Sequence, residues 1–71
     1  MKIKINKEVF FEHLNLLNIT QKEFCRINGI FFETMDKVIN DEIEYDYKLF
    51  KLISERLGVP YYDLIIVEFY D

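Results

Sequence analysis

The stretch TQKEFCRINGI, residues 20–30, decides the fold that we expect for this chain. Thr20 is a favourable N-cap, and Glu23 three residues later completes a capping-box pattern, so a helix is predicted to begin here. Three residues are expected to face inward from this helix: Phe24, Cys25 and Ile27. The helix is expected to end before Gly29, which permits the left-handed turn that leaves a helix. Ile30 then follows as a residue of the core.

The next stretch, FFETMDKVINDEIEYD at residues 31–46, is strongly acidic, with six acids, one base and a net charge of −5. The whole chain carries −4, so its acidity is concentrated here. A helix is predicted over Phe32–Ile39. Its buried positions are expected to be Met35, Val38 and Ile39, and its outward positions Glu33, Asp36, Lys37 and Asn40. One interpretation of the acids is a solvated surface that keeps the protein soluble.

Three more helices are predicted around these two, at residues 7–17, 47–57 and 61–64. Asn6 and Asp46 are the expected caps of the first and fourth helices. The first helix is expected to face the core through Val9, Phe10, Leu14 and Leu17. Short strands are predicted at both ends, over residues 1–5 and 65–69. The chain is therefore expected to form a single domain over residues 1–71, with a helical core at 7–65.

The two terminal strands carry matching features. Lys2 and Lys4 lie on the first strand and Glu68 on the second, so pairing the strands places opposite charges near one another. Two strands alone are marginal in water unless they pair and pack. Pairing within one chain and pairing between two copies both satisfy the pattern, and exposed matching edges favour the second. A homodimer through the strands is expected, with contacts from Ile3, Ile5, Ile66 and Phe69.

The composition argues against several classes of function. One Cys in 71 residues does not allow an internal disulfide, and no stretch approaches the roughly 18 apolar residues of a membrane span. The N-terminus lacks the pattern of a signal peptide, so a reducing cytoplasm is the expected location. The sequence contains no phosphate-binding glycine loop, activated nucleophile or paired metal ligands. We therefore expect neither an enzyme nor a metal or cofactor site.

The pattern resembles the lambda repressor/Cro-type (Xre) helix-turn-helix family over roughly residues 8–65. The matching features are Thr20-Gln21 at the start of the second helix, the buried pair Phe24-Cys25, Gly29-Ile30 at the turn, Thr34-Met35 and Val38 in the third helix, and LFKLISERLGVPYYDLI at residues 49–65. The resemblance implies a mainly α, five-helix lambda-repressor-like helix-turn-helix domain with short terminal β-strands. It also implies a transcriptional regulator that binds operator DNA as a dimer, with its third helix in the major groove.

By position, the resemblance implies DNA contacts from Thr20, Gln21, Phe31, Phe32, Glu33, Thr34, Lys37 and Asn40. The chain departs from the family at Phe31, Phe32 and Glu33, where small polar or basic residues are usual. One of the two phenylalanines is expected in the core and the other at the surface. Aromatic residues rimmed by acids are typical of protein interfaces. A second hypothesis is therefore a protein-protein interaction module on the same scaffold, an inhibitor of the antirepressor or DNA-mimic type that uses this face.

Overall fold

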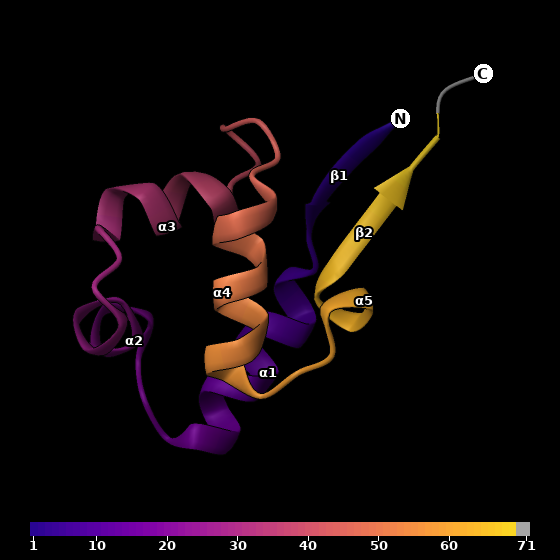
Figure 1. The fold of residues 1–71 in the computed structure, drawn as a ribbon. Helices are drawn as coiled ribbons and strands as arrows, with labels where there is room; N and C mark the ends of the chain where they lie inside the picture. The colour runs from indigo at the N-terminus through magenta and orange to yellow at the C-terminus, as the bar shows by residue number, and fades with distance from the viewer. Residues whose placement is uncertain (70–71) are drawn as a thin grey trace.

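The computed structural model describes residues 1–69, in which five helices and two short strands follow one another (Figure 1). The elements are β1 Lys2–Ile5, α1 Lys7–Leu17, α2 Gln21–Asn28, α3 Phe32–Ile39, α4 Tyr47–Leu57, α5 Tyr61–Leu64 and β2 Ile65–Glu68. Most of these residues are helical, so the expected mainly α class with short terminal strands is confirmed. The helices have the predicted bounds, and each strand is one residue shorter than expected. Residues 70 and 71 of the expected domain lie outside the described part.

Side-chain caps begin three of the helices at the predicted residues. Asn6 and Asp46 each accept a hydrogen bond from the amide three residues later, in both cases at 3.2 Å. At α2 the Thr20 hydroxyl oxygen accepts the Glu23 amide at 3.1 Å, and the Glu23 carboxylate accepts the Thr20 amide at 3.4 Å. These bonds satisfy amides that the first turn of a helix leaves without an intrahelical partner. Gly29, at φ +67°, ends α2 in the left-handed conformation as expected.

One apolar core receives side chains from all five helices and from β1. In Figure 1, α4 lies between α2 and α3 on one side and the strands on the other. The Phe10 ring meets the Phe24 ring edge-on, with centroids 5.8 Å apart, and so joins α1 to α2. The buried apolar residues are Ile5, Phe10, Leu14, Phe24, Cys25, Met35, Val38, Ile39, Phe50, Ile53, Leu57, Val59 and Leu64. Each large side chain of this kind contributes about 1.5–3 kcal/mol by leaving water.

The prediction that Ile27 faces inward is wrong, because its side chain is 59% exposed. Successive residues of a helix are rotated by about 100° around its axis. Viewed along the axis, residue 28 therefore points in a direction between those of Phe24 and Cys25, towards the core. That residue is Asn28, which is half-buried, and its side-chain amide donates a hydrogen bond to the Phe24 carbonyl at 2.8 Å. The inward position in the last turn of α2, which was predicted for Ile27, is therefore occupied by the polar Asn28.

The prediction for the end of α1 is also wrong at one residue. Phe10 and Leu14 are buried as expected, but Leu17 is 48% exposed. The chain turns at Asn18, which has a φ of +58°, and the Ile19 amide then donates to the Leu14 carbonyl at 3.1 Å. This turn brings Ile19 against the core in place of Leu17.

The terminal strands pair with each other within the chain. They are antiparallel, with the register Lys2↔Glu68, Ile3↔Val67, Lys4↔Ile66 and Ile5↔Ile65. A salt bridge joins Lys4 to Glu68 across the sheet, and another joins Lys2 to Asp41 in the loop after α3. The opposite charges that the sequence places on the two strands therefore meet inside one molecule. Ile5, which was expected at a dimer contact, is buried in the core.

Candidate nucleic-acid interface

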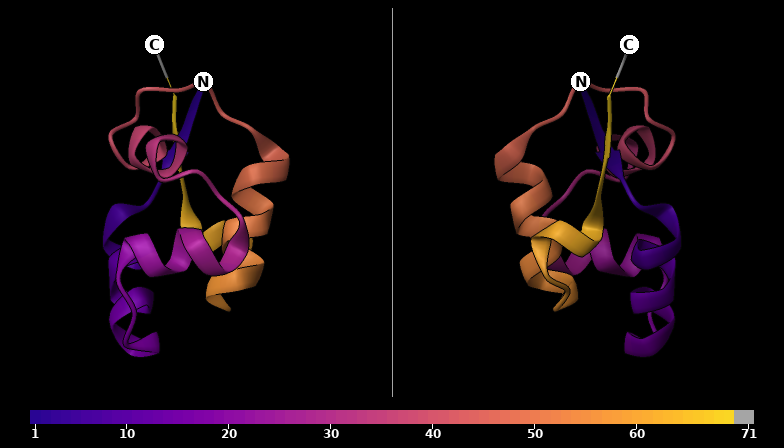
Figure 2. Two further views of the ribbon diagram at one scale, coloured as in Figure 1. Left: turned by 90° about the vertical axis from the view of Figure 1, so that its left-hand side faces the viewer. Right: turned by 90° about the vertical axis from the view of Figure 1, so that its right-hand side faces the viewer.

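Helix α3 lies at one margin of the fold. It runs across the view in Figure 1, whereas α2 is seen nearly end-on, so the two axes cross steeply. The left-hand view of Figure 2 shows the converse, with α2 running across and α3 seen end-on. Only residues 29–31 separate the two helices. The inward side of α3 is buried through Met35, Val38 and Ile39, as predicted. Its exposed residues are Phe32, Glu33, Asp36 and Lys37, and the C-cap Asn40 is exposed as well.

Two phenylalanines lie exposed at the start of α3. Phe31 is 83% exposed and Phe32 is 48% exposed, so the prediction that one of them is core is wrong. The core positions on either side of them are filled by Ile30, which packs against the buried cluster, and by Met35, which is fully buried. A shallow hollow of about 450 Å³ is lined by Phe31, Phe32, Glu33 and Thr34. These four predicted site residues are therefore brought together on one surface.

The two candidates at the start of α2 differ in how accessible they are. Thr20 is exposed, but its hydroxyl oxygen is engaged with the Glu23 amide and carboxylate. Gln21 is half-buried, and its amide nitrogen is buried with no hydrogen-bond partner among residues 1–69. Because this nitrogen is closed to solvent, a ligand could reach it only if the Gln21 side chain moved. Thr20 thus has a structural role, whereas Gln21 retains an unused donor.

The acids of residues 31–46 have different surroundings. Asp41 forms the salt bridge with Lys2, and Asp46 accepts the Leu49 amide at the start of α4. Asp46 is nevertheless exposed, as are Glu33, Asp36, Glu42 and Glu44. Asp41 also has a φ of +58°, a conformation that Asp tolerates better than most residues. The net charge of −5 therefore overstates the repulsion at α3, because the carboxylate of Asp41 has a cationic partner.

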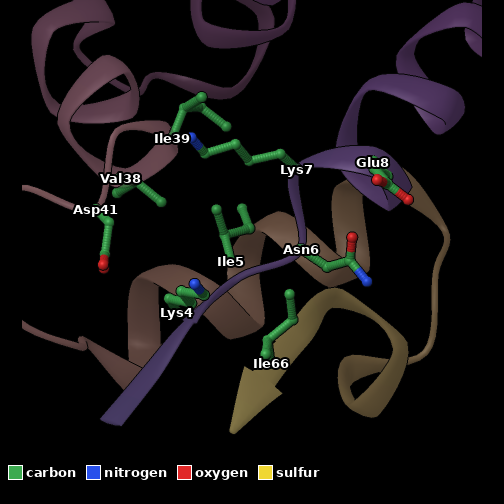
Figure 3. A pocket seen from close by; sticks show the side chains of 9 residues that line it. All are labelled: Lys4, Ile5, Asn6, Lys7, Glu8, Val38, Ile39, Asp41 and Ile66. Carbon is green, nitrogen blue, oxygen red and sulfur yellow. The ribbon is translucent and has the colours of Figure 1, made fainter. Parts of the chain in front are cut away.

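Basic side chains reach the opposite end of α3. Lys37 is exposed on the helix itself, and Figure 3 shows the Lys7 side chain extending from the start of α1 towards Ile39. A hollow of about 560 Å³ lies beside Lys7, lined by Lys4, Ile5, Asn6, Lys7, Glu8, Val38, Ile39, Asp41 and Ile66. Sequence reasoning missed this hollow because it joins segments far apart in the chain. Lys22 and Arg26 are exposed on α2.

The Cys25 and His13 side chains are both engaged in the structure of the domain. Burial raises the pKa of the Cys25 thiol, which keeps it protonated and a poor nucleophile. The Nδ1 of His13 donates a hydrogen bond to the Val9 carbonyl, one turn earlier in α1, at 2.9 Å. Within residues 1–69, no three His, Cys, Asp or Glu side chains gather in a way that would hold a metal ion. The helices of this region are too short to span a bilayer.

Comparison of the chain with protein-family models, with curated proteins and with solved structures found no match.

Proposed function

We propose that this protein is a small DNA-binding transcriptional regulator in which α2 and α3 form a helix-turn-helix and α3 enters the major groove. The observation that carries the proposal is the arrangement of α3. Its inward side is fixed by three buried apolar residues, while four outward residues and the C-cap Asn40 are exposed at the margin of the fold. The steep crossing of α2 and α3 and the short turn between them match the docking geometry of this motif.

The outward side chains of α3 are of kinds that contact particular base edges in the major groove. A glutamate accepts from the amino group of cytosine, and an apolar side chain contacts the methyl group of thymine. Glu33 and Phe32 lie side by side at the start of α3, so they suit these two roles. Gln21, at the start of α2, would have to turn its buried amide nitrogen outward to reach DNA. Thr34, Lys37 and Asn40 complete the set of proposed contacts.

Phosphate contacts are assigned to the basic residues around α3. Lys37 and Lys7 lie at the end of α3, and Lys22 and Arg26 are exposed on α2. DNA binding through such contacts releases counterions, so the affinity falls steeply as salt concentration rises. Asp36 is exposed on α3 between Glu33 and Lys37, and its charge opposes phosphate binding.

The test is retention of fragments from a genomic library in a gel shift at about 50 mM salt. With a retained fragment as probe, Lys37→Glu is expected to lower the affinity roughly tenfold or more, and Asp36→Asn to raise it. Arg56→Glu is the matched control, because Arg56 is exposed in the last turn of α4, at the end remote from α3 (Figure 1). Absence of any retained fragment, or equal loss in Lys37→Glu and Arg56→Glu, would contradict the proposal.

A second candidate function is binding of a protein partner through the same face. The observation that favours it is the 83% exposure of Phe31 beside Phe32 and Glu33, in a segment rich in acids. Exposed aromatic side chains with a polar rim are frequent anchors of protein interfaces. The partner would present a basic surface, as the DNA-contacting face of a repressor does, and the protein would act as its inhibitor.

The substitution Glu33→Lys separates the two functions because its expected effects have opposite signs. For a DNA binder it removes a repulsive charge and raises non-specific affinity for duplex DNA. For a protein binder it reverses a charge at the interface and abolishes capture of the partner in a pull-down, as does Phe32→Ala. Ile27→Ala, at an exposed apolar residue of α2, is the control that retains the partner. Capture that survives both Glu33→Lys and Phe32→Ala excludes this face.

A further inference from the structure

The hollow of about 560 Å³ beside Lys7 lies where the start of α1 and the two strands meet the end of α3. Its volume is within the range of roughly 300–1,000 Å³ that small-molecule sites occupy. Its apolar residues come from three elements, Ile5 from β1, Val38 and Ile39 from α3, and Ile66 from β2 (Figure 3). The first three belong to the buried core, so packing of the whole domain fixes this apolar surface.

The charged groups around the hollow differ in whether they have a partner. Lys4 forms a salt bridge with Glu68, and Asp41 forms one with Lys2. Lys7 is exposed and has no salt bridge within residues 1–69. The hollow therefore has at its rim one cation whose charge is left without a partner in this part of the chain.

Lys7 and its neighbour Glu8 point in different directions in Figure 3. The Lys7 side chain extends towards Ile39, so its apolar stem passes along the apolar residues and carries the amine with it. The Glu8 carboxylate points away from Ile39, on the other side of the backbone. The second acid that lines the hollow, Asp41, is engaged by its salt bridge. The hollow thus presents an available amine beside an apolar surface.

We propose that this hollow binds a small monocarboxylate with an apolar chain. The carboxylate accepts a charge-assisted hydrogen bond from the Lys7 amine, and the chain lies against Ile39, Ile5 and Ile66. Ligand sites of this kind combine an apolar lining with a few polar groups that fix the orientation of the ligand. The inference is independent of the proposed function, and its test uses no DNA, so its failure would leave the DNA-binding proposal intact.

Titration of the full chain with octanoate, followed through the backbone amide chemical shifts, tests the site. The shifts are expected to saturate at roughly millimolar octanoate and to be largest at Ile5, Val38, Ile39 and Ile66. Hexanoate is expected to bind roughly threefold or more weakly, because its chain is shorter by two methylenes. Octylammonium, which has the same chain and the opposite charge, is expected to bind roughly tenfold or more weakly. The whole chain carries −4, so general attraction would favour octylammonium, and a preference for octanoate reports on the hollow itself.

Two substitutions separate the cation from the apolar surface. Lys7→Glu reverses the charge at the rim and is expected to weaken octanoate binding roughly tenfold or more. An acid suits the first turn of a helix, so this variant is expected to remain folded by circular dichroism. Ile66→Thr keeps a β-branched residue in β2 and is expected to weaken octanoate binding roughly threefold. Arg56→Glu, at the end of α4 remote from α3, is the control with the same change of charge and is expected to bind octanoate as the wild type does.

Several results would overturn the inference. One is the absence of saturable shifts up to roughly 10 mM octanoate. Others are equal binding of octanoate and octylammonium, and equal affinity of Lys7→Glu and the wild type for octanoate. Shifts centred on exposed apolar residues elsewhere, such as Leu16 of α1 at 73% exposure, would show adventitious binding to the surface and would also overturn it.

Discussion

Replacement of Thr20 by alanine tests whether this side chain serves the helix or the nucleic acid. In the structure its hydroxyl oxygen accepts the Glu23 amide at 3.1 Å, which is a good bond, whereas the return bond to the Thr20 amide is long at 3.4 Å. Thr20→Ala removes the good bond and also the bond that the hydroxyl donates to the Glu23 carboxylate at 3.2 Å, and it leaves the weak one. Loss of such a cap costs about 1 kcal/mol. In a domain of this size that corresponds to a fall in Tm of roughly 4–8 °C.

The assay is thermal unfolding followed by circular dichroism, with urea unfolding as a second measure of the free energy. Thr20→Ser retains the hydroxyl oxygen, so its Tm is expected to stay within about 2 °C of the wild type. If Thr20 acts only as a cap, Thr20→Ala binds a retained DNA fragment normally at a temperature where it is fully folded. An unchanged Tm in Thr20→Ala, or equal losses in the alanine and serine variants, would refute the capping argument.

Three further predictions concern the elements that hold α3 in place. Met35→Ala creates a cavity under α3 and is expected to cost about 2–5 kcal/mol in urea unfolding, whereas Ile27→Ala, at an exposed position, is expected to cost less than about 0.5 kcal/mol. Gly29→Ala is expected to cost about 1–2 kcal/mol through its φ of +67° alone, because a Cβ there meets no atom within 4 Å. Burial raises the pKa of the Cys25 thiol above its ordinary value of 9.0. The native state then keeps the thiol proton to a higher pH than the unfolded state does, so the free energy of unfolding is expected to fall as pH rises above 9.0. In Cys25→Ala this free energy is expected to fall less steeply with pH. A thiol reagent is expected to label Cys25 only when the protein unfolds.

The helices could be predicted from the sequence because local signals agree with the packing. Thr20 and Glu23 start α2, Gly29 ends it, and Asp46 starts α4, and each acts within a few residues of itself in the chain. Such caps depend on local geometry and need no knowledge of the tertiary fold. The buried side of α3 was also predictable, since Met35, Val38 and Ile39 recur at helical spacing.

The errors arise where hydrophobicity was taken as a guide to burial. Ile27 and Leu17 are apolar but lie away from the core, while the polar Asn28 occupies an inward position by bonding to its own helix. Apolar residues are often exposed in small domains, because little polar surface is available to cover them. The hollow beside Lys7 and the salt bridge between Lys2 and Asp41 depend on long-range packing, which no local pattern of residues encodes.

The distribution of charge along α3 bears on the proposed function more than its total. In the helix-turn-helix motif the first residues of the recognition helix contact base edges, and basic side chains around it contact phosphates. Here the aromatic and acidic residues Phe31, Phe32 and Glu33 are at the start of α3, where the proposed docking would give a carboxylate a partner in cytosine. Lys37 and Lys7 are at its other end, and the nearby Asp41 is engaged by Lys2. In the proposed docking, Glu33 would lie where DNA offers a hydrogen-bond donor, and Lys37 and Lys7 would lie where it offers phosphates, whereas the exposed Asp36 would oppose phosphate binding. The effect of each acid on the proposed DNA binding therefore depends on its position along α3.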